Sequence, residues 1–137
     1  MGSEDQPLRI LIADDHALVR SGLALLLRML DSNCSVVEAN NLEETLKALE
    51  ANPDLDLVLI DLLMPGMNGF GGLRHVRETA PEVPVIVVSV RESSEDIQDA
   101  IDAGAMGYIP KTSTPEVTLG AIRLVLSGGV YLPPHLL

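Results

Sequence analysis

The sequence has 137 residues, of which 47% are apolar and only 2% aromatic, and its formal net charge is -11. This length predicts one domain with a core of Leu, Val, Ile and Ala, and no stretch approaches the ~18 apolar residues that a membrane span requires. The negative charge disfavours nucleic acid or an anionic membrane as a direct partner, because binding to phosphates depends on clustered Lys and Arg. The first residues contain no apolar signal region, so we expect a cytoplasmic domain.

The chain alternates between apolar strands and amphipathic helices after a polar, flexible segment over residues 1–7. In chain order, the predicted elements are strand 8–13, helix 16–30, strand 34–39, helix 41–51, strand 55–60, helix 70–80, strand 83–89, helix 93–104, strand 107–110 and helix 114–127. Five strands that alternate with five helices through right-handed crossovers predict an α/β fold with a doubly wound parallel sheet.

Helix ends are marked by residues that favour caps. Asn41 is placed to cap the second helix, with the acidic Glu44 three positions further on. Gly104 is placed to end the fourth helix. Thr114 precedes Pro115, which is typical of an N-cap followed by proline at the first helical position.

Acidic residues follow two of the strands. The branched apolar residues 57–60 indicate a strand buried on both faces, and Asp61 comes where this strand ends. Asp14 and Asp15 follow the first strand in the same way. Because the carboxyl ends of parallel strands meet at one sheet edge, where open α/β folds bind ligands, these side chains are expected to lie together. Asp61 is therefore a metal ligand, a nucleophile or the N-cap of the next helix.

A hydroxyl and an ammonium group are predicted at the same edge, since Ser89 ends the fourth strand and Lys111 follows the fifth. Three clustered carboxylates repel one another unless a cation binds or protons are taken up, and an oxygen-rich site suits Mg²⁺. The hydroxyl and the ammonium can then hold phosphoryl oxygens, and aspartate is a known covalent acceptor of phosphate. Taken singly, the acidic pair is also a plausible helix cap, Ser89 a turn residue and Lys111 a surface charge.

Four short motifs stand at these strand ends: Ile-Ala-Asp14-Asp15-His, Asp61-Leu-Leu-Met-Pro-Gly, Val-Val-Ser89 and Gly-Tyr108-Ile-Pro-Lys111. Together they resemble the receiver domain of bacterial two-component response regulators. Residues 14–20 and 107–115 further resemble the subfamily that carries a LuxR- or NarL-type helix-turn-helix output domain. The resemblance implies a receiver domain over residues 8–128, and residues 129–137 as the start of a linker to an output domain outside this chain.

The resemblance also implies a role for each residue of the site. Asp61 would accept the phosphoryl group, and Lys111 would contact it. Asp14, Asp15, Asp61 and the backbone carbonyl of Leu63 would hold Mg²⁺. Ser89 and Tyr108 would form the switch. The family's fold is a flavodoxin-like sheet with strand order 2-1-3-4-5.

The implied partner is a sensor histidine kinase, with control of transcription through a DNA-binding domain that this chain lacks. The domain's own chemistry would be limited to its phosphorylation and dephosphorylation. Two other functions stay open. A Mg²⁺-dependent aspartyl phosphohydrolase would need a second aspartate at position 63, which is Leu63. A protein-interaction module without phosphoryl turnover is the other, since Leu63 and Val90 depart from the commonest receiver pattern. His16 is interpreted as a surface histidine that contacts the kinase, and Arg91 as a solvated charge.

The last helix is rich in apolar residues on more than one face. Val117, Ala121 and Leu124 are expected to pack inward. A second apolar stripe is then expected on the surface: Leu119, Ile122 and Leu126. Such a stripe usually marks an interface, here a homodimer through the last helix or through the face formed by the fourth helix, fifth strand and last helix. The alternative is that this stripe completes the core.

Overall fold

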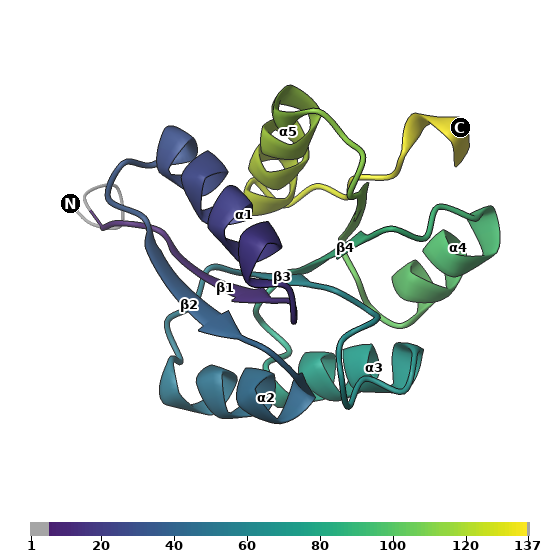
Figure 1. The fold of residues 1–137 in the computed structure, drawn as a ribbon, viewed down its shortest axis with the longest axis horizontal. Coiled ribbons are helices and arrows are strands. Elements are labelled where there is room, and N and C mark those ends of the chain that lie inside the picture. The colour runs from purple at the N-terminus through teal and green to yellow at the C-terminus, as the bar shows by residue number, and fades with distance from the viewer. Residues whose placement is uncertain (1–5, 137) are drawn as a thin grey trace.

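The computed structural model describes residues 6–136, which form a five-stranded parallel sheet with helices on both faces (Figure 1). The strands are β1 (Arg9–Ala13), β2 (Ser35–Ala39), β3 (Leu57–Ile60), β4 (Val85–Ser89) and β5 (Gly107–Pro110). The helices are α1 (Ala17–Leu30), α2 (Leu42–Ala51), α3 (Phe70–Thr79), α4 (Ser94–Asp102) and α5 (Pro115–Leu126), followed by a 3₁₀ turn, η2 (Pro134–Leu136). The strand order is β2-β1-β3-β4-β5, so the predicted fold class and order are confirmed. The predicted flexible segment lies mostly outside the described residues.

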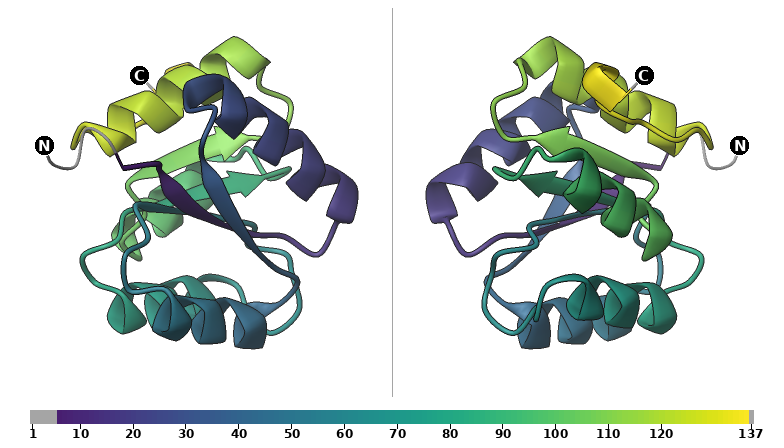
Figure 2. Two further views of the ribbon diagram at one scale, coloured as in Figure 1. Left: turned by 90° about the vertical axis from the view of Figure 1, so that its left-hand side faces the viewer. Right: turned by 90° about the vertical axis from the view of Figure 1, so that its right-hand side faces the viewer.

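The helices divide into two layers, with α1 and α5 on one face of the sheet and α2, α3 and α4 on the other (Figure 2). Successive strand residues point to opposite faces, so Ile10 and Ile12 join the α1–α5 core while Leu11 and Ala13 join the other. Every residue of β3 is buried, as expected for a central strand covered on both sides. Within residues 6–136, none of the helices is long and apolar enough to span a lipid bilayer.

The predicted helix caps are confirmed. The Asn41 side chain accepts a hydrogen bond from the backbone N–H of Glu44 at 2.8 Å, and Thr114 accepts one from Val117 at 3.2 Å. Gly104 adopts a φ of 108°, a conformation open to glycine at little cost. The fourth strand begins at Val85 and not at residue 83, because Pro84 has no N–H to donate to the ladder.

The predicted orientation of the last helix is wrong. Val117 and Leu124, expected inside, are each 41% exposed, whereas Ala121 is buried as predicted. Leu119 and Ile122, expected on the surface, are 7% and 0% exposed, and Leu126 is half-buried against the same core. A helix with apolar residues on most sides does not determine from its sequence which side faces the sheet. The alternative, that Leu119 and Ile122 complete the core, is correct.

Helix α1 exposes an apolar stripe that the sequence analysis missed. Leu18 is 85% exposed, Leu25 66% and Met29 69%. These positions are seven and four residues apart, so they lie along one side of the helix. The opposite side packs on the sheet through Leu23 and Leu27.

The described chain after α5 returns to the edge of the sheet. Tyr131 pairs in parallel with Gly107 at the free edge of β5. Its N–H donates to the carbonyl of Met106 at 3.0 Å, and its carbonyl accepts a hydrogen bond from the N–H of Tyr108 at 3.2 Å. Leu132 and Leu136 pack against the core on the α2–α4 face. Around Tyr131, the expected linker therefore covers part of the β5 edge, where unpaired backbone groups would otherwise be exposed.

The loop from Asp61 to α3 is held by a close approach at Gly72. A Cβ atom at this position would lie 2.6 Å from the carbonyl oxygen of Met67 and 2.8 Å from its Cα. The backbone N–H of Gly72 also donates to the same carbonyl at 2.6 Å. Met67 is 1% exposed, so neither partner has room to move. Gly72 thus fixes the loop directly behind Asp61.

We predict that Gly72→Ala destabilises the protein by about 1–3 kcal/mol, since its methyl group meets backbone atoms and forces the loop to shift. Gly71→Ala, in the same turn of α3 and with nothing within 4 Å of its Cβ, is the matched control. This variant should be neutral or more stable by up to ~1 kcal/mol. Urea unfolding monitored by circular dichroism measures both, and equal stabilities of the two variants would contradict the prediction.

Candidate functional site

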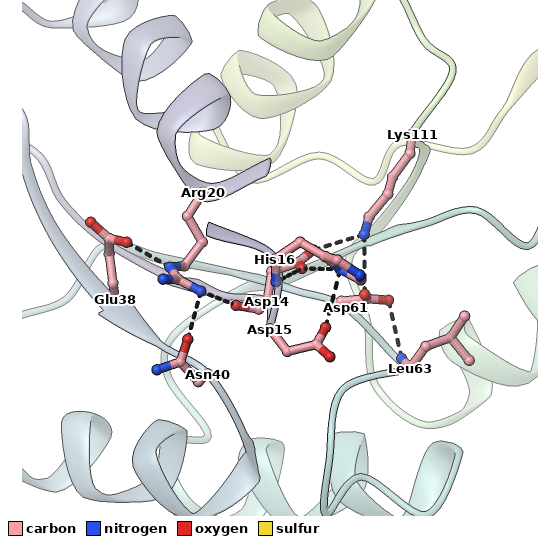
Figure 3. A network of polar contacts seen from close by, with 9 residues as sticks. All are labelled: Asp14, Asp15, His16, Arg20, Glu38, Asn40, Asp61, Leu63 and Lys111. Atoms are coloured by element: carbon pink, nitrogen blue, oxygen red, sulfur yellow. Dashed lines mark hydrogen bonds and ion pairs between the residues drawn. The ribbon is translucent and has the colours of Figure 1, made fainter. Parts of the chain in front are cut away.

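Two buried carboxylates meet at the carboxyl edge of the central strands (Figure 3). Strands β1 and β3 pair in register up to Ala13 and Ile60, and the backbone N–H of Asp61 then donates to the carbonyl of Ala13 at 2.9 Å. Asp14 and Asp61 follow these last pairs, and each is only 2% exposed. The predicted meeting of the two aspartates is therefore confirmed, with both in a setting where an unpaired charge would be costly.

Lys111 supplies the opposite charge. Its Nζ lies 2.8 Å from Oδ2 of Asp14 and 3.1 Å from Oδ2 of Asp61, and its side chain is 15% exposed. The backbone N–H of Lys111 donates to the carbonyl of Ser89 at 2.8 Å, which anchors the residue to the end of β4. Burial disfavours the ammonium, but its hydrogen bonds to the two carboxylates outweigh this and raise the pKa of Lys111 above its ordinary value. Lys111 is thus a partner of the acidic site and not a surface charge.

Asp15 and His16 complete the acidic side. The Nδ1 atom of His16 lies 3.1 Å from Oδ1 of Asp14 and 3.2 Å from Oδ1 of Asp15. One ligand atom from each of Asp14, Asp15, His16 and Asp61 lies within 4.8 Å of the others. Carboxylate oxygens at this spacing fit a hard divalent cation such as Mg²⁺. The backbone N–H of Leu63 donates to Oδ1 of Asp61 at 3.0 Å, so this residue borders the same pocket.

Arg20 holds the acidic loop from behind, a role that the sequence analysis missed. Its Nη1 donates to the backbone carbonyl of Asp14 at 2.6 Å and to Oδ1 of Asn40 at 2.7 Å, and its Nε pairs with Glu38 at 2.6 Å. The side chain is only 13% exposed. Its position one helical turn after His16 is the available sequence signal, but its partners, Glu38 on β2 and Asn40 directly after it, emerge only from the fold. Arg20 therefore ties α1, the end of β1 and the end of β2 together (Figure 3).

Ser89 and Tyr108 are linked through the backbone of Arg91. The hydroxyl oxygen of Ser89 accepts a hydrogen bond from the N–H of Arg91 at 3.2 Å, and the hydroxyl of Tyr108 donates to the carbonyl of Arg91 at 2.9 Å. Ser89 and Tyr108 are both 0% exposed, and burial raises the pKa of Tyr108. Tyr108, a switch residue by the family resemblance, is therefore already buried in this structure. The guanidinium of Arg91 lies 3.8 Å from Asp96, at the start of α4.

Comparisons with known proteins agree with this geometry. The family model of the response regulator receiver domain matches residues 10–123. The chain is 40% identical over 129 residues to the glycerol metabolism activator of Pseudomonas putida, a match that covers 94% of this chain and 58% of that protein. It is 38% identical over 130 residues to the nitrate/nitrite response regulator NarL of Escherichia coli K12, covering 95% of this chain and 60% of that protein.

The fold is also similar to solved structures of response regulators. A LuxR family DNA-binding response regulator from Silicibacter pomeroyi superposes with a TM-score of 0.82 at 34% identity, covering 95% of this chain and 99% of that chain. The present chain spans about 58–60% of the length of these two sequence relatives.

We predict that Lys111→Met lowers the free energy of unfolding by about 1–3 kcal/mol in metal-free buffer, because two buried carboxylates lose their cationic partner. Lys47→Met is the control, since Lys47 and Glu43 form an ion pair whose side chains are 74% and 77% exposed, and such pairs contribute little. The raised pKa of Lys111 implies that its contribution is complete below pH 10.5 and is lost as the pH rises further. The difference from wild type in urea unfolding should therefore narrow above that pH, and a difference that stays constant would refute the assignment.

Proposed function

Because this chain belongs to the response regulator receiver domain family, we propose that it accepts a phosphoryl group from a sensor histidine kinase on Asp61. The observation that carries the proposal is the contact of 3.1 Å between the Lys111 ammonium and Asp61, beside Asp14 and Asp15. A nucleophilic carboxylate, a cation fixed next to it and further carboxylates for a metal are the components that phosphoryl transfer needs. The domain acts in signalling, and its own phosphorylation and dephosphorylation are its proposed chemistry.

The metal would be held by the acidic cluster. Receiver domains bind Mg²⁺ at an acidic pocket, and the proposed ligands here are Asp14, Asp15, Asp61 and the backbone carbonyl of Leu63. When bound, Mg²⁺ neutralises negative charge on the phosphoryl oxygens and orients them.

The chain's own residues would act around Asp61 in a defined order. The carboxylate oxygen of Asp61 forms a bond to phosphorus as the bond from phosphorus to the donor's histidine nitrogen breaks. The ammonium of Lys111, already 3.1 Å from Asp61, then contacts the oxygens of the transferred group. Because Lys111 also holds Asp14 at 2.8 Å, the carboxylates keep a fixed spacing before the group arrives.

The switch would act through the backbone of Arg91. The Ser89 hydroxyl oxygen accepts a hydrogen bond from the N–H of Arg91 at 3.2 Å in this structure, and after transfer the hydroxyl would turn to a phosphoryl oxygen and release that N–H. The backbone of Arg91 then keeps its hydrogen bond from the Tyr108 hydroxyl to its carbonyl, so the segment between β4 and α4 can shift. Because Tyr108 is already buried, no rotation of its ring is needed as a first step.

The surfaces available to partners follow from the exposed apolar residues. The stripe of Leu18, Leu25 and Met29 on α1 begins two residues after His16, which contacts Asp14 and Asp15, so the stripe offers the kinase an apolar surface that starts near the acidic pair. Val117 and Leu124 on α5, each 41% exposed, remain for a homodimer through the last helix or the α4–β5–α5 face. Control of transcription is proposed to proceed in the cytoplasm through an output domain outside this chain, and the similar protein of Silicibacter pomeroyi is a LuxR family DNA-binding response regulator.

An aspartyl phosphohydrolase is disfavoured by Leu63, which is 46% exposed and offers no acid or base at the position such an enzyme requires. A module that only binds proteins would not be phosphorylated at all. Labelling with acetyl phosphate therefore separates such a module from a phosphoryl acceptor.

We predict that incubation with Mg²⁺ and acetyl phosphate adds roughly 80 Da to the intact protein, the mass of one phosphoryl group on a carboxylate. Asp61→Asn should abolish the addition, since the amide is not a nucleophile. Asp54→Asn, an aspartate whose side chain is 62% exposed in an ion pair with Arg9, should label like wild type. Equal labelling of the Asp61 variant would place the phosphoryl group elsewhere, and no labelling of wild type would favour the interaction module.

We predict that phosphorylation strengthens self-association by about 5–150-fold, the usual size of a coupling of ~1–3 kcal/mol between two sites. Ser89→Ala should still be labelled on Asp61 but should lose most of this gain, because its Arg91 N–H has no hydroxyl acceptor even before phosphorylation and labelling then changes nothing at that bond. Sedimentation velocity with and without beryllofluoride, a phosphoryl mimic, measures the effect. A Ser89→Ala protein that associates like wild type would exclude the route through Arg91.

A further inference from the structure

We propose that residues 131–136 form a strap that closes the free edge of β5 while Asp61 is unphosphorylated, and that phosphorylation of Asp61 releases this strap. The inference rests on the proposed function, because the release starts at the phosphoryl site. It goes further in stating which segment of this chain responds to the phosphoryl group and through which contacts.

Two glycines direct the chain from α5 onto β5. Gly128 has a φ of 99°, in the left-handed region that favours glycine, and its N–H donates to the carbonyl of Val125 at 3.0 Å. The N–H of Gly129 donates to the carbonyl of Leu124 at 2.9 Å, which completes a Schellman motif. A Cβ atom at Gly129 would lie 2.5 Å from Cδ1 of Leu124, so a larger residue would displace that side chain. The turn back to the sheet is therefore specified at the end of α5 (Figure 1).

The backbone pairing between the strap and the sheet is short. Among the described residues, two backbone hydrogen bonds join the strap to β5 and the residue before it, from Tyr131 to Met106 and from Tyr108 to Tyr131. In a parallel ladder, the next pair of bonds would use the N–H groups of residues 133 and 110. Both positions are proline, which has no N–H, so the pairing stops after Tyr131.

Side-chain packing holds the strap on one side. Leu132 and Leu136 are half-buried against the core on the α2–α4 face. On the other side, a groove of about 310 Å³ lies between the strap and the start of α5, and its lining includes Val117, Tyr131 and Pro133. A tightly packed element leaves no such gap. The strap is therefore a segment of low local stability that can open while the rest of the domain stays folded.

The contacts of the strap adjoin the switch. Tyr108 donates its N–H to Tyr131 and its hydroxyl to the carbonyl of Arg91, and the N–H of Arg91 donates to Ser89. The core cluster beneath the two leucines of the strap also contains Tyr108 and Ile97 of α4. A shift of the segment between β4 and α4 thus changes the backbone contact and the apolar contact together. Phosphorylation can release the strap because these contacts differ between the two states.

Amide hydrogen exchange of the full chain, measured by NMR with and without Mg²⁺ and beryllofluoride, tests the release directly. The Tyr108 amide, which donates to Tyr131, should exchange at least about tenfold faster when beryllofluoride is bound. The Val58 amide, which donates to the carbonyl of Pro84 in the centre of the sheet, is the reference and should not change. Unchanged exchange at Tyr108 would overturn the inference.

Binding affinities test the same coupling from the other direction. If beryllofluoride weakens the strap, a weaker strap must strengthen beryllofluoride binding, because coupling between two sites is reciprocal. Leu132→Ser removes an apolar contact with the core, and Tyr131→Pro removes the N–H that donates to Met106. Val130→Ser is the matched control, since Val130 is 48% exposed directly before the strap.

In isothermal titration calorimetry with Mg²⁺ present, both strap variants should bind beryllofluoride about threefold or more tightly than wild type, and Val130→Ser should bind like wild type. A variant that is merely less stable would not bind more tightly. Equal affinities in all four proteins would overturn the inference, while binding by wild type and labelling of Asp61 would leave the proposed function intact. A wild-type protein that neither binds beryllofluoride nor is labelled would overturn both.

Discussion

The structure of the site depends on one ammonium group placed between two buried carboxylates. Asp14 and Asp61 come from adjacent strands that end together, so the fold itself forces like charges into one crevice. Such proximity is unfavourable unless a cation is present, and Lys111 provides it from the end of β5, at 2.8 and 3.1 Å. A parallel sheet makes this possible, because it delivers residues distant in the chain to the same edge.

Contacts around the site hold the backbone that carries Asp14 and Asp61 in place. Arg20 holds the backbone carbonyl of Asp14, and its other bonds reach the end of β2. Gly72 lets α3 approach the loop behind Asp61 closely enough for its N–H to bond Met67. Neither residue touches the place where a phosphoryl group would sit. Both residues limit the movement of the backbone around Asp14 and Asp61, and phosphoryl transfer depends on such fixed positions.

The backbone of one residue, Arg91, connects this crevice to the fifth strand. Arg91 donates its N–H to the Ser89 hydroxyl and accepts a hydrogen bond from the Tyr108 hydroxyl at its carbonyl, so Ser89 and Tyr108 bind successive peptide groups on either side of Arg91. Tyr108 also donates its own N–H to Tyr131, in the segment that follows α5. A change at Ser89 is therefore three hydrogen bonds from the segment that follows α5.

Local patterns in the sequence determined the alternation of elements, the caps at Asn41 and Thr114, and the strand-end residues of the site. These features depend on side-chain periodicity and on short-range hydrogen bonds, both of which can be read from neighbouring residues. Only the tertiary structure decided which side of α5 is buried, because apolar residues on several faces leave the choice to the sheet beneath. The contacts of Arg20 with Glu38 and Asn40, the direction of the His16 ring and the burial of Tyr108 were decided in the same way. Each of these features depends on the position of another element in space, and the distance between two elements far apart in the chain cannot be read from local sequence patterns.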